Sequence, residues 1–170
     1  LILKIMQEDG RASVSEIAKK VKLSIPAAGE RIKKLSEKGH VEYQKYKGVK
    51  LTEKGRLAAV SVIRKHRLWE VFLVKKLNFS WDEVHEVAEQ LEHIKSDKLT
   101  QQLDAFLEYP KEDPHGDSIP DADGNFYPTK KVILAQINKN QSCICVGVKD
   151  STTDFLQYLD KHSIALGTKI

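Results

Sequence analysis

The 170-residue chain has little cysteine and no long apolar run, and each absence excludes a class of protein. Its two cysteines, Cys143 and Cys145, are too few for a disulfide framework, and no second pair exists for a tetrahedral zinc site. No stretch reaches the roughly 20 apolar residues that a membrane helix needs, and the chain does not open with a basic-then-apolar signal segment. We therefore expect a cytoplasmic protein with no membrane partner.

The charges that are present are unevenly distributed. Residues 1–68 carry 17 Lys and Arg against seven Asp and Glu, a net of +10. Residues 69–170 carry 11 against 17, a net of −6. A basic part joined to an acidic part suggests a nucleic-acid-binding region followed by a separate regulatory region.

The basic part has the pattern of a winged helix-turn-helix. A capping box, Ser13 to Glu16, starts one short helix, and Ser24 and Pro26 start a second helix that ends at Gly39. A basic β-pair with a Lys-Gly turn follows and predicts a wing. The residues that we expect at the DNA are Ser24, Pro26, Ala27, Glu30, Arg31, Lys33, Lys34, Lys47 and Lys50.

Three further helices are predicted from capping residues and apolar periodicity. Thr52 caps a helix that runs to about Lys76, the box from Ser80 to Glu83 starts the next, and Asp97 caps the third. Trp69, Trp81 and several leucines give this block more apolar surface than it can bury alone, so we expect a homodimer.

The last third changes character. Residues 109–128 contain four of the five prolines and predict a linker or ordered loop. Beyond them, V-I-L-A-Q-I and S-C-I-C-V-G-V predict strands, and a short helix follows over 153–161. The sequence thus predicts a mainly α fold with a β wing: a winged helix-turn-helix domain (1–55), a helical dimerisation domain (56–108), a linker (109–128) and a truncated small β-rich domain (129–170). We expect further chain on both sides.

Carboxylates and imidazoles recur at helical spacing in the acidic part. His85, Glu89, Glu92 and His93 stand at i, i+4, i+7 and i+8, which places them on one stripe of a helix. His66 and Glu70 repeat the i, i+4 spacing one helix earlier. No Lys or Arg lies between residues 83 and 94, so a bound cation balances this stripe better than solvent does. Nitrogen and oxygen ligands from two helices predict a site for a divalent first-row metal.

With these motifs in order, the chain resembles the diphtheria-toxin-repressor family of iron- and manganese-dependent transcriptional regulators. The similarity rests on Y-Q-K-Y-K-G-V-K-L-T-E-K-G-R, I-R-K-H-R-L-W-E, V-H-E-V-A-E-Q-L-E-H-I-K-S-D and H-G-D-S-I-P, and it covers essentially the whole chain. It implies a winged-helix domain, a helical dimerisation and metal-binding domain and, in many members, a third small β-barrel domain.

The resemblance also implies a distribution of ligands. Glu89, Glu92 and His93 match the primary, activating site, to which the family adds a ligand from the first helix, upstream of Leu1. The ancillary site is implied to contain His66, Glu70 and His85, and a polar residue of the third domain, here Asp154.

The resemblance indicates which metals the protein binds but not which DNA sequence it recognises. Iron-responsive members have a cysteine at the position of Glu89, and the harder carboxylate favours Mn(II), although Fe(II) stays open and other divalent first-row metals are expected to substitute. Gly29 and Glu30 depart from the family at the recognition helix, so the operator sequence is not predicted.

The sequence therefore predicts a Mn(II)- or Fe(II)-dependent repressor of metal-uptake genes that binds double-stranded operator DNA as a homodimer and takes no small-molecule substrate. Two alternatives remain open: a winged-helix regulator with no metal response, and a metal-dependent enzyme. The enzyme is disfavoured because the H-E-x-x-H motif is absent, and because the two predicted helices that carry the ligands contain no E-x-x-H motif of the di-iron kind.

Overall fold

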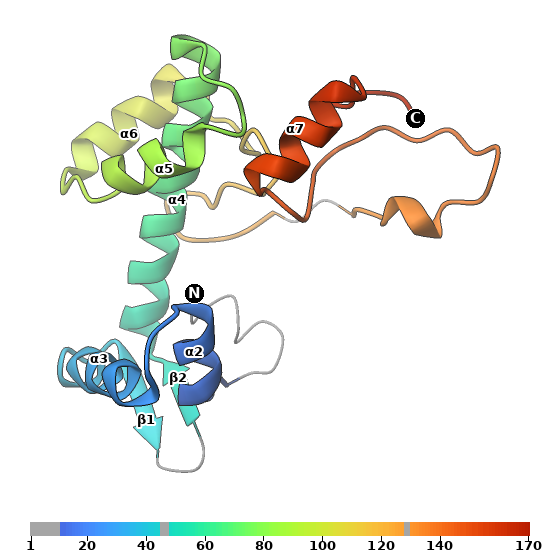
Figure 1. The fold of residues 1–170 in the computed structure, drawn as a ribbon. Helices are drawn as coiled ribbons and strands as arrows, with labels where there is room; N and C mark the ends of the chain where they lie inside the picture. Colours follow the sequence, from blue (N-terminus) through green and yellow to red (C-terminus); the bar gives the residue numbers. More distant parts are fainter. Residues whose placement is uncertain (1–10, 45–47, 128–129) are drawn as a thin grey trace. The chain divides into compact units, whose positions relative to one another are not determined.

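The computed structural model describes residues 11–44, 48–127 and 130–170 and divides the chain into two compact units, one ending at Ser61 and one beginning at Val62. Figure 1 shows the helices and strands of both units. The turn of the predicted wing, at Lys47, lies outside the described residues.

Two helices and a hairpin form the first unit: α2 (Val14–Lys20), α3 (Ile25–Glu37), β1 (Val41–Gln44) and β2 (Gly48–Leu51). The predicted capping box is made in full, because the Ser13 hydroxyl accepts from the Glu16 amide and the Glu16 carboxylate accepts from the Ser13 amide. Ser24 caps α3 by accepting from the Ala27 amide at 3.3 Å. The strands are antiparallel, and Val41 pairs with Leu51. This arrangement confirms the winged helix-turn-helix.

A small apolar core joins these elements. Its members are the buried residues Ala12, Ile17, Ile32, Val41 and Val49. The backbone of Ala12 extends the hairpin by one antiparallel bridge to Val49, with N···O distances of 3.0 and 2.8 Å. The helices and the wing are therefore fixed to each other within this unit.

Helix α4 (Glu53–Leu77) begins in the first unit and continues into the second. Thr52 caps it as predicted, since its hydroxyl accepts from the Gly55 amide at 3.0 Å and donates to the Gly39 carbonyl at 2.7 Å. Gly55 lies against the backbone of His40: a Cβ atom built at Gly55 would stand 1.8 Å from that carbonyl oxygen.

In the second unit, α5 (Val84–Leu91) and α6 (Asp97–Phe106) pack against α4. Leu68 and Val71 of α4 pack with Leu103 of α6, and Leu73 packs with Val84 and Ala88 of α5. None of the described helices has both the length and the apolar composition needed to cross a membrane.

Two capping predictions in this unit were wrong in detail. Only half of the box at Ser80 forms: its amide donates to the Glu83 carboxylate at 3.1 Å, while α5 itself starts after Glu83 with no side-chain cap. Helix α6 is capped by Ser96, whose extended backbone lets its hydroxyl accept from the Leu99 amide, so Asp97 is the first helical residue.

The proline-rich segment is an ordered loop held by two arginines of α4. The Arg64 guanidinium pairs with Asp104 at 2.5 Å and donates to the Pro120 carbonyl at 2.6 Å. Arg67 pairs with Asp117 at 2.7 Å and donates to the Ser118 carbonyl. Residues 113–120 are thereby fixed beside α4.

The C-terminal segment lacks the predicted strands. Over residues 132–137 the structure has a short 3-10 helix, η1 (Leu134–Gln136), and within residues 130–170 the pairing of extended chain is a single antiparallel bridge, Ile144 with Lys169. Alternation of side chains does not supply a partner strand, and Val132, Ile133 and Leu134 stay exposed. Helix α7 (Thr153–Lys161) forms as expected.

Candidate metal centre

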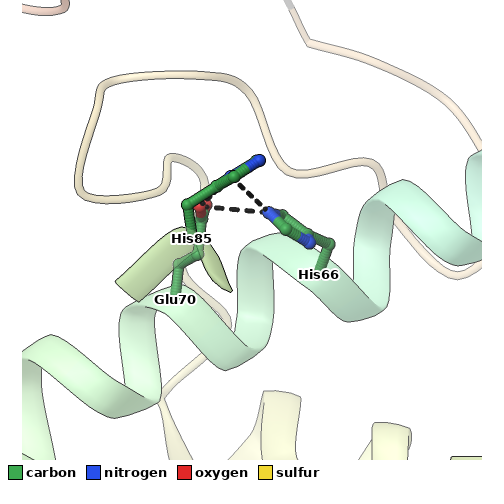
Figure 2. Close-up of side chains that lie close together, drawn as sticks. All are labelled: His66, Glu70 and His85. Carbon is green, nitrogen blue, oxygen red and sulfur yellow. Dashed lines mark hydrogen bonds and ion pairs between the residues drawn. The ribbon is translucent and has the colours of Figure 1, made fainter. Parts of the chain in front are cut away.

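Two helices bring His66, Glu70 and His85 together. His66 and Glu70 project from α4 one turn apart, and His85 reaches them from α5 (Figure 2). The His66 Nε2 atom lies 3.1 Å from a Glu70 carboxylate oxygen and 3.1 Å from His85 Nδ1. His85 Nδ1 is 3.4 Å from the same Glu70 oxygen. The predicted i, i+4 pair and its partner on the next helix thus converge on one point.

Glu70 is the buried centre of this cluster, with 2% of its surface exposed. Burial by itself disfavours the carboxylate, but the neighbouring imidazoles of His115, His66 and His85 outweigh it and hold the Glu70 pKa far below its usual range. His66 has the complementary environment: burial disfavours its imidazolium, while Glu70 and Glu92 overcome that effect and raise the His66 pKa. The Glu70 side chain is therefore ionised, and the ionised carboxylate is the form that binds a cation.

Glu92 extends the cluster on the other side of His66. Its carboxylate oxygen lies 2.7 Å from His66 Nδ1, so one imidazole bridges Glu70 and Glu92. Glu92 is the C-cap residue of α5, directly after the last helical turn. A residue implied for the primary site and a residue implied for the ancillary site thus share His66.

A second cluster uses the same glutamate. Glu70, Asp113 and His115 are all buried, and the ring Nδ1 of His115 lies 3.8 Å from Glu70 and 4.0 Å from Asp113. Asp113 also accepts from the His115 and Asp117 amides, at 2.8 and 2.9 Å, which fixes its carboxyl group within the loop.

In this second cluster two buried carboxyl groups, those of Glu70 and Asp113, lie close enough for the charge of one to disfavour ionisation of the other. Burial and the nearby charge of Glu70 raise the pKa of Asp113 to about 6. For His115, burial favours the neutral ring, but the nearby Glu70 carboxylate and the hydrogen bond to the Trp81 carbonyl raise its pKa. A cation at this point would relieve the repulsion between the two carboxylates.

The donor sets of both clusters fit a divalent metal. In each trio the ligand atoms lie within 4.8 Å of one another. Because metal–nitrogen and metal–oxygen bonds are roughly 2.0–2.2 Å long, two ligands on opposite sides of an ion are at most roughly 4.4 Å apart, so small side-chain adjustments suffice. Imidazole and carboxylate together suit first-row divalent ions.

Asp113 and His115 were missed as ligands in the sequence. They stand on an irregular loop, where no periodicity indicates a shared face. The available signal was the H-G-D-S-I-P stretch and the aspartate two residues before it.

Other predicted ligands lie apart from these two trios. Glu89 on α5 and His93 just beyond it are exposed, and neither is part of a ligand cluster within the described residues. Asp154 is exposed in the first turn of α7 and belongs to neither trio. Their assignment as ligands stays a prediction.

Most of the predicted DNA-contacting residues are exposed on the first unit. Ser24 and Pro26 open α3, and Ala27 in its first turn is half-buried. The charged members within the described residues are exposed: Glu30, Arg31, Lys33, Lys34 and Lys50. Lys47 lies outside the described residues.

Comparison with known proteins agrees with this arrangement. The family model "Iron dependent repressor, metal binding and dimerisation domain" matches residues 52–121, and an AsnC-type helix-turn-helix domain model matches residues 1–36. A solved structure, "Manganese-dependent transcriptional repressor complex with manganese", superimposes with a TM-score of 0.81 at 38% identity, covering 94% of this chain and 73% of that one. The chain belongs to the diphtheria-toxin-repressor family of iron- and manganese-dependent regulators.

Curated relatives match over shorter spans. The iron-dependent repressor IdeR of Mycobacterium tuberculosis is 33% identical over 116 residues, which are 68% of this chain and 50% of that protein. A probable metal transport system membrane protein of Chlamydia trachomatis is 46% identical over 70 residues, 41% of this chain and 16% of that protein. The chain thus spans half or less of the length of these curated relatives.

Proposed function

We propose that this chain is a metal-dependent DNA-binding regulator of transcription, acting as a repressor. The observation that carries the proposal is the pair of convergent ligand clusters around the buried Glu70, in a chain that also contains a winged helix-turn-helix. Membership in a family of metal-dependent repressors supports it. Genes for metal uptake are the targets that we expect.

The ligands would act by joining elements that are far apart in sequence. His66 and Glu70 stand on α4, His85 on α5, and Asp113 and His115 on the loop held by Arg67. When bound, the ion supplies positive charge that these carboxylates and imidazoles need in order to lie together. By binding one ion, the residues would favour the arrangement of helices that is competent for DNA over the others, to the extent of their differential affinity.

Mn(II) or Fe(II) is the proposed metal, with Mn(II) favoured. The described clusters contain only oxygen and nitrogen ligands, and carboxylates favour the harder ion. We retain Glu89, Glu92 and His93 as the primary site, completed by a ligand from the first helix. The bridge from Glu92 to His66 supports this assignment, because it ties that site to the ancillary ligands.

Double-stranded operator DNA is the proposed partner. The exposed basic residues of α3 and β2 would contact phosphates, and the start of α3 would approach base edges in the major groove.

A homodimer is also proposed. The apolar side chains left exposed on α4 and α6 would supply its interface: Val62 is 41% exposed, Leu99 39% and Phe106 60%. Trp69 is not part of this surface, because it packs against Phe72 and the core of its own chain. Two copies would present two recognition helices to a two-fold symmetric operator.

The proposal is tested by fluorescence anisotropy on labelled genomic DNA fragments, at fixed salt, with chelator, Mn(II), anaerobic Fe(II) or Zn(II). We expect tight binding only with Mn(II) or Fe(II), and we expect Glu70→Gln, which removes the carboxylate shared by both clusters, to weaken the metal response while leaving the fold intact by circular dichroism. Arg56→Ala, outside both clusters, is the matched control. Equal binding with chelator and with metal would instead indicate a winged-helix regulator without a metal response.

A further inference from the structure

One ring nitrogen of His115 is hydrogen-bonded to the protein backbone. Its Nε2 atom lies 2.7 Å from the carbonyl oxygen of Trp81. Because a carbonyl can only accept, Nε2 carries the hydrogen, and in the neutral ring the lone pair is then on Nδ1. That is the atom that faces Glu70 at 3.8 Å and Asp113 at 4.0 Å. The Trp81 backbone thus selects the tautomer that can bind a metal.

Trp81 is in turn held by α7, a helix about 80 residues further along the chain. The indole Nε1 donates to both carboxylate oxygens of Asp160, each at 3.1 Å. The residue after Trp81 is held by the same helix, because the Gln157 amide of α7 donates to the Asp82 carboxylate at 3.0 Å. The indole ring also lies nearly parallel to the His115 ring, at 10° with a centroid distance of 6.4 Å.

The backbone on the other side of His115 is fixed by the same C-terminal segment. The His115 carbonyl accepts from the Val148 amide at 3.0 Å. Gly116 lies so close to this segment that a Cβ atom there would stand 2.3 Å from the Val146 carbonyl oxygen. The residue that carries the second-cluster imidazole is therefore held by residues 146–160 through both its backbone and, by way of Trp81, its side chain.

We propose that Trp81 and Asp160 are positioning residues for the Glu70–Asp113–His115 cluster: Asp160 holds the Trp81 indole, and the Trp81 carbonyl holds His115 with Nδ1 toward the metal. This inference rests on the proposed metal-dependent function. Hydrogen-bond partners of a ligating histidine fix its orientation and tautomer, and their loss typically weakens metal binding about 10–100-fold. By reciprocity, a metal on His115 stabilises the docking of α7.

The first test examines the metal-free protein and requires no metal binding. Long-range proton–nitrogen NMR spectra of the histidine side chains, recorded where the imidazoles are neutral, report the tautomer of each ring. The signal of His115 is assigned by its loss in His115→Gln. We expect the Nε2–H tautomer in the wild type and in Asp160→Asn, which keeps an acceptor oxygen, and a mixture of tautomers in Asp160→Ala. Lys161→Ala, one residue further on α7, is the matched control.

The second test measures metal affinity on the same variants. Co(II) is titrated and followed by visible absorption, and Asp113→Asn identifies the signal of this cluster. We expect Asp160→Ala to raise the Kd of that signal about tenfold and Asp160→Asn and Lys161→Ala to leave it within about twofold. If Asp160→Ala does not fold by circular dichroism, Trp81→Phe, which loses the indole donor and keeps the ring, takes its place with the same expectation.

The outcomes separate the two proposals. An unchanged tautomer and an unchanged Kd in Asp160→Ala or Trp81→Phe would overturn the positioning role. A wild-type protein that binds no Co(II) would overturn the proposed function, while the tautomer spectra would still decide whether Trp81 orients His115.

Discussion

At the scale of single residues, Glu70 dominates the chemistry of this chain. It is almost fully buried, and one of its carboxylate oxygens lies 3.1–3.8 Å from ring nitrogens of three histidines, one on α4, one on α5 and one on the loop. An ionised carboxylate in such a place is costly unless positive charge is near, and here protonated imidazoles or a metal supply it. Because both clusters share this one carboxylate, an ion in one cluster changes the charge that the other cluster presents.

Asp113 offers a direct test of the repulsion within the second cluster. Its pKa is raised from 3.8 to about 6, and at about 1.4 kcal/mol per pKa unit the ionised group carries a penalty of roughly 3 kcal/mol. Asp113→Asn keeps an acceptor for the two loop amides but removes the charge. We expect it to stabilise the metal-free protein by about 1–2 kcal/mol, the remainder being lost with the 3.4 Å contact to Arg67.

The sign of this effect depends on pH. The penalty is present above the folded pKa of about 6 and disappears as the carboxyl becomes protonated in both states, toward the unfolded value of 3.8. Urea unfolding at about pH 7.5 and at about pH 5 should therefore show a larger gain for Asp113→Asn at the higher pH. The same variant should lose the part of the stabilisation by added Mn(II) that the second cluster supplies. A variant less stable than wild type at the higher pH would contradict this account.

The site was predictable where its residues obey a period. The spacing of His66 and Glu70 and the stripe that begins at His85 predicted ligands converging from two helices, and the family resemblance grouped these three residues. The structure brings them within 3.4 Å. Asp113 and His115 were not predictable in the same way. Their position depends on Arg67 and on the Trp81 backbone, which are tertiary contacts that no local pattern encodes.

At the scale of elements, the first turn of α4 lies against the backbone of His40, the residue directly before the first strand of the wing. Gly55 leaves no room for a side chain beside the His40 carbonyl. Gly55→Ala must push α4 away from the wing, and we expect a loss of about 1–3 kcal/mol in the free energy of unfolding, as for overpacked cores.

A matched glycine provides the control. Gly29 lies inside α3 with nothing within 4 Å of an added Cβ atom. Since alanine is a better helix former than glycine, Gly29→Ala should stabilise the protein by about 0.5–1 kcal/mol. Thermal unfolding followed by circular dichroism distinguishes the two variants. Equal effects on the midpoint would show that α4 does not pack against the wing as closely as the structure indicates.

Helices and strands differed in how well the sequence predicted them. Capping residues and apolar periodicity are local, and they located α2, α3, α4 and α7 closely. The segment V-I-L-A-Q-I has the right residue types for a strand, but a strand exists only when a partner forms hydrogen bonds with it. Within residues 130–170 no strand pairs with residues 132–137, and the short helix η1 forms there instead.

At the scale of the whole molecule, charge and ligands are separated along the chain. The basic residues proposed for DNA belong to the first unit, while His66, Glu70, His85, Asp113 and His115 belong to the second. Since phosphate contacts depend on counterion release and metal binding on local ligands, the two properties should respond to different mutations.

The last prediction follows from this separation. Lys33→Ala with Lys34→Ala should weaken DNA binding on every sequence and reduce the slope of log Kobs against log salt by about 1–2, because up to two phosphate contacts are lost. The affinity of the free protein for Mn(II), measured by calorimetry, should not change. Glu70→Gln should do the reverse: it should weaken Mn(II) binding, because both clusters lose their shared carboxylate, and leave the salt slope of metal-independent DNA binding as in wild type. If the lysine variant also weakened Mn(II) binding without DNA, the metal and the DNA surface would be coupled in the free protein, and the independence of the two units would be wrong.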